Sequence, residues 1–139
     1  MQRVLAISAM LLLLSACMTD SKEQILATNQ SAVQLRSFQT RAFDTTDRVK
    51  TLKTVISTLQ DLNFVVDKAD ALLGTVTATK LDRYALRMTV TVRERGTTQT
   101  LVRANAQYQV IAVEDPKPYQ QFFEALQKAM FLTAHEVDG

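Results

Sequence analysis

The feature that most constrains the fold is a pair of long segments in which apolar and polar residues alternate, on either side of Gly96 and Thr97. They span residues 84–95 and 98–113. The apolar positions are Leu86, Met88, Val90 and Val92 in the first segment, and Val102, Ala104, Ala106, Tyr108 and Val110 in the second. A period of two is typical of a strand with one buried and one solvated face, and glycine favours a tight turn. The sequence therefore predicts a hairpin within a one-sided antiparallel sheet.

Two further segments have the period of an amphipathic helix. The first follows Asp44–Asp47, whose aspartates and threonines are preferred N-cap residues, and Asn63 is expected to end it in the left-handed conformation. The second is expected to carry Pro118 in its first turn. Apolar residues recur at steps of three and four in both. They are Val49, Leu52, Val55, Ile56, Leu59 and Leu62 in the first, and Tyr119, Phe122, Phe123, Leu126 and Met130 in the second.

The remaining segments complete a layered domain. Val33–Phe43 alternates weakly and is predicted to be an edge strand. Residues 64–66 are predicted to be a short strand, residues 67–73 a loop, and Thr75–Lys80 a strand that follows a turn at Gly74. The order of elements predicts an α+β fold of two layers. It has an antiparallel sheet of about four to five strands with two helices on one face and a polar opposite face.

The N-terminus predicts export and a lipid anchor. Arg3 precedes an apolar run, Val4–Leu14, which is shorter than the roughly 20 residues of a spanning helix and has the size of a signal-peptide core. The run ends in Leu14-Ser15-Ala16-Cys17, which resembles the lipobox of bacterial lipoproteins. The resemblance implies cleavage before Cys17, a diacylglycerol on its sulfur and an acyl chain on its amine. A chance cysteine in an ordinary signal peptide and an uncleaved anchor stay open as alternatives.

These signals divide the chain into three parts. Residues 1–16 are expected to be a cleaved signal peptide, residues 17–32 the lipidated cysteine and a polar tether, and residues 33–139 a single periplasmic α+β domain. In lipoproteins of Gram-negative bacteria, aspartate after the cysteine favours the inner membrane. Met18 stands there in this chain. In such a host the resemblance therefore implies the outer membrane, with the domain facing the periplasm.

Charge and residue usage argue against several classes of function. The formal net charge is +2, and loss of Arg3 with the signal peptide leaves 15 basic against 14 acidic residues, so no bulk charge favours nucleic acid. The three glycines cannot form a phosphate-binding loop, and His135 has no second histidine beside which to bind metal. Asp61, Asp67 and Asp70 lack the pattern of a calcium loop. We therefore expect no enzyme activity, no metal and no cofactor other than the lipid on Cys17.

The polar face of the predicted hairpin is the candidate binding surface. Arg87, Arg93 and Arg103 alternate with small polar residues and lie near Asn105 and Gln107. Arginine pairs well with carboxylates and phosphates, so these residues are candidates for contact with an acidic partner. The alternative is that they are only the solvated side of a one-sided sheet.

The order of elements from Val33 to Ala134 is similar in outline to the helix-grip domains of accessory lipoproteins of the outer-membrane barrel-assembly machinery. The similarity implies a non-enzymatic accessory or assembly factor that binds another envelope protein. The alternative function is a carrier of a lipid or small amphiphile held between helix and sheet. A dry cavity under the last helix would favour the carrier, and a filled core with exposed apolar residues near Phe131 would favour a protein partner. The sequence does not indicate an oligomeric state.

Overall fold

A computed structural model describes residues 32–135 of the chain. Arg36–Gly139 forms one compact unit, and this unit contains every core side chain of the described part. The expected signal peptide, Cys17 and the tether up to residue 31 lie outside the described residues. The elements are β1 (Thr40–Phe43), α3 (Arg48–Asp61), β2 (Val65–Asp70), β3 (Thr75–Asp82), β4 (Tyr84–Arg95), β5 (Gln99–Tyr108), β6 (Ile111–Ala112) and α4 (Pro116–His135).

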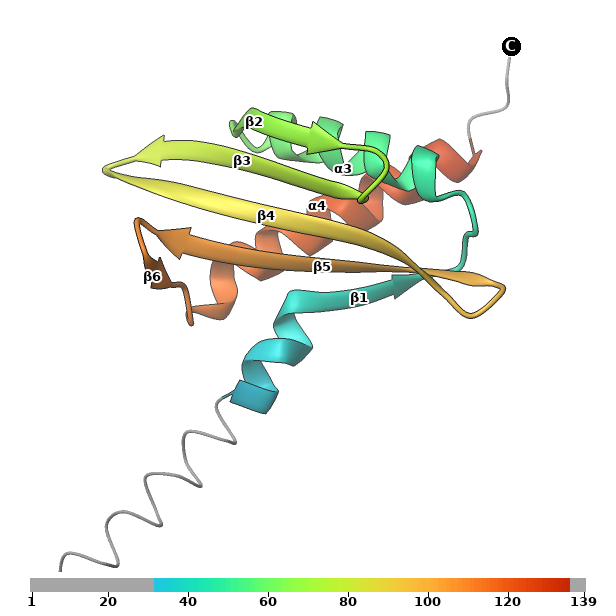
Figure 1. Ribbon diagram of the computed structural model, residues 1–139, viewed down its shortest axis with the longest axis horizontal. Coiled ribbons are helices and arrows are strands. Elements are labelled where there is room, and N and C mark those ends of the chain that lie inside the picture. The colour runs from blue at the N-terminus through green and yellow to red at the C-terminus, as the bar shows by residue number, and fades with distance from the viewer. Residues whose placement is uncertain (1–31, 136–139) are drawn as a thin grey trace, which may run out of the picture. The chain divides into compact units, whose positions relative to one another are not determined.

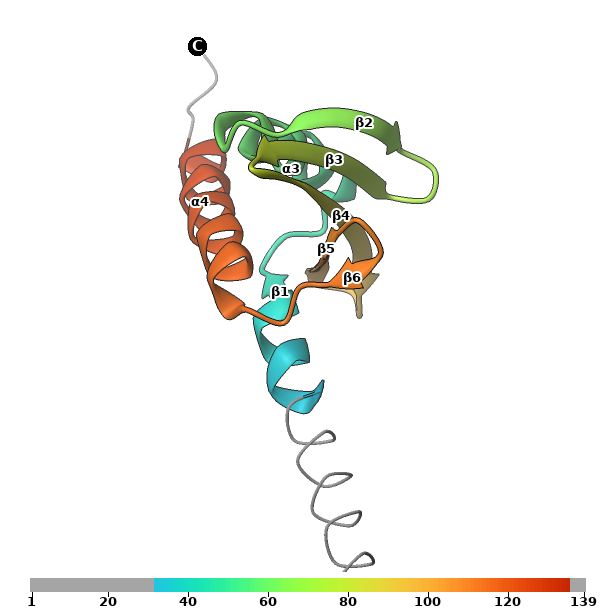
Figure 2. The same ribbon diagram turned by 90° about the vertical axis from the view of Figure 1, so that its left-hand side faces the viewer.

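The described part of the unit is an antiparallel sheet with helices on one face (Figures 1 and 2). The strand order is β1-β5-β4-β3-β2, and β6 also pairs with β5. The predicted two-layer α+β fold is therefore confirmed. Among the described residues the sheet has six strands, more than the four to five expected, because β1 and the two-residue β6 pair with different parts of β5.

Side chains fill the central space between sheet and helices, and an open hollow of about 350 Å³ remains at one end, where Leu62, Leu86 and Pro118 are among the lining residues. The alternation of the central hairpin is confirmed, since the inward residues of β4 and β5 from Leu86 to Val92 and from Val102 to Ala106 are all buried. From α3, Leu52, Val55 and Leu59 face them. From α4 come Tyr119, Phe122, Phe123 and Leu126, each with no exposed surface. The ring centroids of Phe122 and Phe123 lie 5.1 Å apart in an edge-to-face arrangement.

The predicted strand Val33–Phe43 is wrong over most of its length. Residues 32–39 are helical, and only Thr40–Phe43 forms a strand. This strand pairs with Thr100–Arg103 of β5 and with no residue beyond Arg103. A strand requires a partner for its backbone groups. Further along β5, the backbone groups of Ala106 bond to Tyr119 and Val113, and Gln107 and Tyr108 pair with β6. Most residues upstream of Thr40 therefore lack a free strand partner, and the local preference of leucine, arginine and glutamine for the helix decides their conformation.

The predicted loop over residues 67–73 is also wrong. Strand β2 extends to Asp70, with a bulge between Val66 and Lys68 where it pairs with β3. A bulge adds one residue to one strand and shifts its alternation by one position. The two-residue period is therefore interrupted at Asp67, and the alternation of the sequence does not predict the second half of the strand.

The second strand of the hairpin ends earlier than predicted. Strand β5 stops at Tyr108, and Gln109 turns the chain with a φ of +57°. Tyr108 and Val110, which were expected to face inward, are 40% and 91% exposed. Tyr108, Val110 and Ala112 occupy every second position of the sequence although the chain turns at Gln109. The alternation of apolar residues therefore predicts a strand that is longer than β5.

The buried side of α3 is rotated from the side predicted. Val49 is 55% exposed, whereas Thr51, Thr54 and Thr58 are buried. Each threonine hydroxyl donates to the carbonyl oxygen four residues earlier, at distances of 2.8–2.9 Å. These bonds satisfy the hydroxyls internally and let threonine replace an apolar residue in the core. The predicted ends of the helix are confirmed, since the Asp47 carboxylate accepts from the Lys50 amide and Asn63 has a φ of +67°.

The hydroxyl of Tyr119 completes one edge of the sheet. It donates to the carbonyl oxygen of Val113 over 2.7 Å and accepts from the amide of Ala106 over 3.2 Å. The Val113 amide donates directly to the Ala106 carbonyl oxygen over 2.9 Å. The side-chain amide of Gln39, just before β1, donates to the same hydroxyl over 3.3 Å. A tyrosine hydroxyl can donate once and accept twice, so all of its capacity is used.

Gly74 lies in the turn between β2 and β3 with a φ of +69°. A β-carbon at this position would overlap the carbonyl oxygen of Val92 and approach Nη1 of Arg48 to 3.2 Å. The Val92 amide donates to the Gly74 carbonyl oxygen over 2.7 Å. The predicted turn at Gly74 is confirmed, and the position requires glycine both for its conformation and for the closeness of β4.

Candidate partner-binding face

The candidate surface is the side of β4 and β5 that faces away from the helices. Arg87, Arg93, Arg103, Asn105 and Gln107 are all exposed there, and we call these five residues the arginine face. Arg87, Arg103 and Asn105 each lie between two buried core residues, and Arg93 and Gln107 each follow one, Val92 and Ala106 respectively. Since successive side chains of a strand point to opposite faces, the burial of the core positions holds the arginine face outward.

The register of β4 against β5 sets the spacing of this surface. The opposed residues are Arg87 with Gln107, Thr89 with Asn105, Thr91 with Arg103 and Arg93 with Leu101. Arg93 and Arg103 are thus diagonal neighbours, with Cα atoms about 7–8 Å apart. Arg87 lies opposite a position four residues from Arg103, which corresponds to roughly 13 Å along the strands. The surface therefore presents two close cations and a third at a distance.

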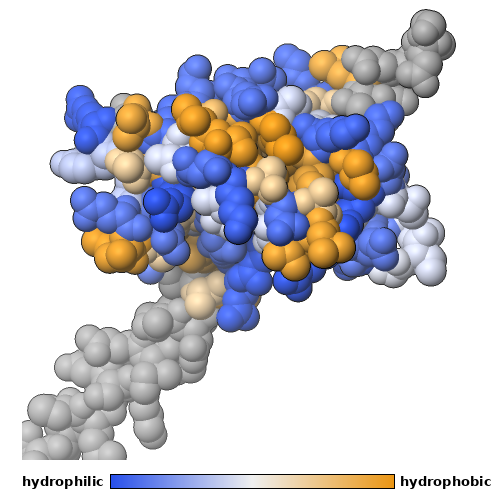
Figure 3. All heavy atoms as spheres, turned by 45° about the horizontal axis from the view of Figure 1, so that its top comes forward, coloured by the Kyte–Doolittle hydropathy of each residue, from blue (hydrophilic) through white to orange (hydrophobic). Residues whose placement is uncertain are grey.

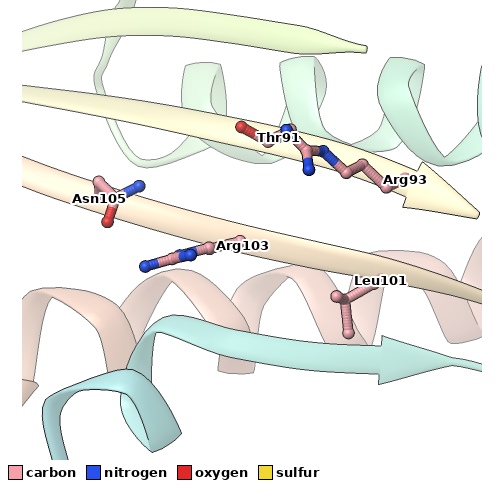
Figure 4. A pocket seen from close by; sticks show the side chains of 5 residues that line it. All are labelled: Thr91, Arg93, Leu101, Arg103 and Asn105. Carbon is pink, nitrogen blue, oxygen red and sulfur yellow. The ribbon is translucent and has the colours of Figure 1, made fainter. Parts of the chain in front are cut away.

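Two open hollows lie along this surface and share Asn105. The first, of about 250 Å³, is lined by Thr91, Arg93, Leu101, Arg103 and Asn105. Figure 4 shows these side chains on the near side of the strands, with the helices behind; in this view Arg103 runs along β5 toward Asn105. The second, of about 350 Å³, is lined by Gln39, Arg87, Thr89, Asn105, Ala106, Gln107 and Ala112. A partner could therefore place side chains against the arginines.

The charges of the outward face are separated. In the part of the chain that the structure describes, none of the three arginines of the arginine face has a carboxylate partner. The acids of this face lie at its β2 edge. Asp67 accepts from the Thr79 hydroxyl over 2.5 Å, and Asp70 accepts from the Leu73 amide over 2.9 Å. The cations of β4 and β5 are therefore available to an outside anion, and the edge acids are engaged locally.

The other candidates from the sequence form no group. Asp61 ends α3, and Asp67 and Asp70 make the local bonds just described. His135 is the last residue of α4. Among residues 32–135 no three histidine, cysteine, aspartate or glutamate side chains lie close enough to hold a metal ion.

Within residues 32–135, every helix falls short of the length and apolar character that a membrane span requires.

Sequence reasoning placed Thr89 and Thr91 on the side of the arginines. It missed four residues that line the hollows: Leu101, Gln39, Ala106 and Ala112. The spacing of β4 indicates that Thr91 shares a side with the arginines, and the pairing across the hairpin turn places Leu101 opposite Arg93. Gln39 carries no such signal, because it reaches the second hollow from the helical residues before β1.

Comparison with known proteins gives no independent indication of function. Neither the known protein-family models nor the curated proteins include one that matches this chain.

Proposed function

We propose that this chain is a membrane-anchored periplasmic lipoprotein that acts as a non-enzymatic accessory or assembly factor. It binds an acidic surface of another envelope protein through the arginine face. The observation that carries the proposal is the set of exposed arginines without carboxylate partners in the described part, around two adjoining hollows. Guanidinium groups form paired, directional hydrogen bonds with carboxylates, so such a surface favours an acidic partner.

The filling of the core supports a protein partner over the carried amphiphile. Tyr119, Phe122 and Phe123 occupy the space under α4 without exposed surface. A carrier needs a cavity that encloses its apolar ligand. The hollow of about 350 Å³ between the end of α3 and the start of α4 is instead open, and charged residues such as Lys80, Asp115 and Lys117 line part of it. Phe131 and Leu132, near the end of α4, are 62% and 54% exposed, and exposed apolar residues at this end are a further feature of a protein-binding domain.

Changing Arg87, Arg93 and Arg103 together to glutamine should leave the stability of the domain nearly unchanged and weaken partner recovery. Isolated exposed charges each contribute less than about 1 kcal/mol to folding. The measurement is a thermal melt beside a pull-down from cross-linked membranes, with added salt in a parallel sample. Salt should reproduce the loss of recovery, because it screens exposed charges.

The matched control changes Lys50, Lys53 and Lys128 to glutamine. These exposed lysines lie on α3 and α4, so the control removes the same charge from the opposite side of the sheet. It should recover the partner as the unchanged chain does. Equal recovery by both variants would contradict the proposed role of the arginine face, and a collapsed melt of the arginine variant would contradict its solvent exposure.

The lipid anchor is tested separately with Cys17→Ala. We expect the variant to remain unprocessed or mislocalised while the domain still folds, because the thiol is the atom that would carry the diacylglycerol. Metabolic labelling with a palmitate analogue measures attachment, and fractionation measures location. Label that persists on the Cys17→Ala protein would rule out this cysteine as the attachment site.

A further inference from the structure

One end of the sheet extends beyond the core. The exposed fraction of the inward-facing side chains of β4 and β5 rises toward this end. It is 8% for Leu86, 40% for Tyr108 and 69% for Tyr84. Tyr108 is opposite Leu86 in the register, and the Tyr84 and Tyr108 ring centroids are 6.4 Å apart in an edge-to-face arrangement. Apolar side chains thus continue along the sheet past the point where the core ends.

Two tight turns lie side by side at this end, at the left of Figure 1. The β3–β4 turn is closed by the pair Asp82 and Tyr84, and the β5–β6 turn by Tyr108 and Ile111. Their exposed large apolar residues form what we call the turn cluster. It consists of Leu81, Tyr84, Tyr108, Val110 and Ile111, with exposures of 84%, 69%, 40%, 91% and 71%. Figure 3 shows orange groups among blue ones at this end.

Each of the two turns contains a residue other than glycine in the left-handed conformation, Arg83 in one and Gln109 in the other. Arg83 lies between Asp82 and Tyr84 with a φ of +58°, and Gln109 has a φ of +57°. A side chain is disfavoured in this left-handed region relative to glycine. Arg83 is exposed at the outer end of the turn, so its guanidinium is presented beside the apolar residues of the turn cluster.

We infer that the turn cluster is a contact site for the surface of a phospholipid bilayer. Leu81 projects at the β3–β4 turn, and Val110 and Ile111 project at the β5–β6 turn, each at least 71% exposed. A bilayer accepts projecting apolar side chains without a matching hollow. Tyrosine, with an apolar ring and a hydroxyl, is suited to the interface region of a membrane. The Arg83 guanidinium complements the phosphate of a lipid headgroup. The β5–β6 turn, Tyr108–Ala112, contains no charged residue that would oppose insertion.

This site is distinct from the arginine face and does not depend on a lipid at Cys17. The arginine face is cationic and should bind in a salt-sensitive way, whereas the turn cluster binds chiefly by removing apolar surface from water. Contact with the bilayer would fix which end of the sheet lies nearest the membrane, and so would direct the arginine face along the membrane surface.

The chain has no tryptophan, so single tryptophans report each end of the sheet. Val110→Trp probes the turn cluster. Leu72→Trp is the matched control, because Leu72 is 85% exposed in the β2–β3 turn at the opposite end. Residues 32–139, which retain every core side chain of the described part, are mixed with excess vesicles of phosphatidylcholine containing phosphatidylglycerol. Fluorescence emission and acrylamide quenching are then measured.

The Val110→Trp protein should shift its emission to shorter wavelength and become shielded from acrylamide, and the Leu72→Trp protein should do neither. Adding Leu81→Ser and Ile111→Ser to Val110→Trp should lower the vesicle partition coefficient at least about tenfold, since each removes an apolar side chain from the contact. The shift should persist in about 0.5 M salt, where exposed charges are screened. An unchanged Val110→Trp spectrum at saturating lipid would overturn the inference. So would equal shifts in both proteins, or a shift that follows protein concentration without vesicles and thus reports self-association.

Discussion

Alanine in place of Gly74 is expected to lower the free energy of unfolding by roughly 2–4 kcal/mol, from the left-handed backbone and from overpacking. The new methyl group would overlap the carbonyl oxygen of Val92. This oxygen belongs to the backbone of a central strand, so the strand itself must move. The same movement would disturb the bond from the Val92 amide to the Gly74 carbonyl oxygen. Urea unfolding followed by circular dichroism measures the loss.

Gly96→Ala is the matched control for this substitution. Gly96 has a φ of +60° in the β4–β5 turn, but a β-carbon there would meet no atom within 4 Å. It should therefore cost only the conformational term, about 1 kcal/mol. If the two alanine variants are equally stable, the close approach between Gly74 and β4 is not present in solution.

Leu59→Ala is expected to cost about 2–5 kcal/mol, the range for a buried leucine whose removal leaves a cavity. Leu59 has no exposed surface, and the fully buried rings of α4 and the residues of β4 fill the same layer. The cavity would lie where α3 meets both α4 and the sheet, and rigid neighbours on two sides limit its collapse. Thermal or urea unfolding of residues 32–139 gives the value.

Val49→Ala on the same helix should change the stability by less than about 0.5 kcal/mol, because Val49 is 55% exposed. The two positions have the same role in the apolar periodicity of the sequence, so the pair tests the position of the buried side directly. A loss at Leu59 well below 1 kcal/mol, or a larger loss at Val49, would show that the buried side of α3 is placed wrongly.

The comparison of these two residues shows how far the sequence determines the fold. Strand β4 and helix α3 could be predicted because a long periodic segment repeats its signal many times. Leu52, Val55 and Leu59 of α3 are buried as the periodicity predicts. The other half of the buried side could not be predicted, because Thr51, Thr54 and Thr58 are polar residues whose hydroxyls are satisfied by the helix itself. The same limit applies to β2, where one bulge breaks the alternation, and to residues 32–39, where the absence of a strand partner decides the structure.

The outward direction of Arg87, Arg93 and Arg103 could be predicted from alternation alone. The hollows around them could not, because they depend on the register between β4 and β5 and on where β1 and β6 leave the edge of β5. Gln39 shows the limit most clearly, since it lines the second hollow and contacts a helix 80 residues away in the sequence. The identity of the partner depends on the surface of another protein, so this sequence does not predict it.

The bonds of the Tyr119 hydroxyl have a consequence for the timing of folding during synthesis. The hydroxyl completes the edge of β5 and also holds Gln39, which precedes the first strand. Tyr119 belongs to the 20-residue helix at the C-terminal end of the described chain, so a nascent chain that lacks this segment has neither a closed sheet edge nor a filled core. The domain can thus reach its native state only after the chain up to the end of α4 has been released. Such a delay would keep the chain unfolded while it passes through a translocation channel, as the proposed export requires.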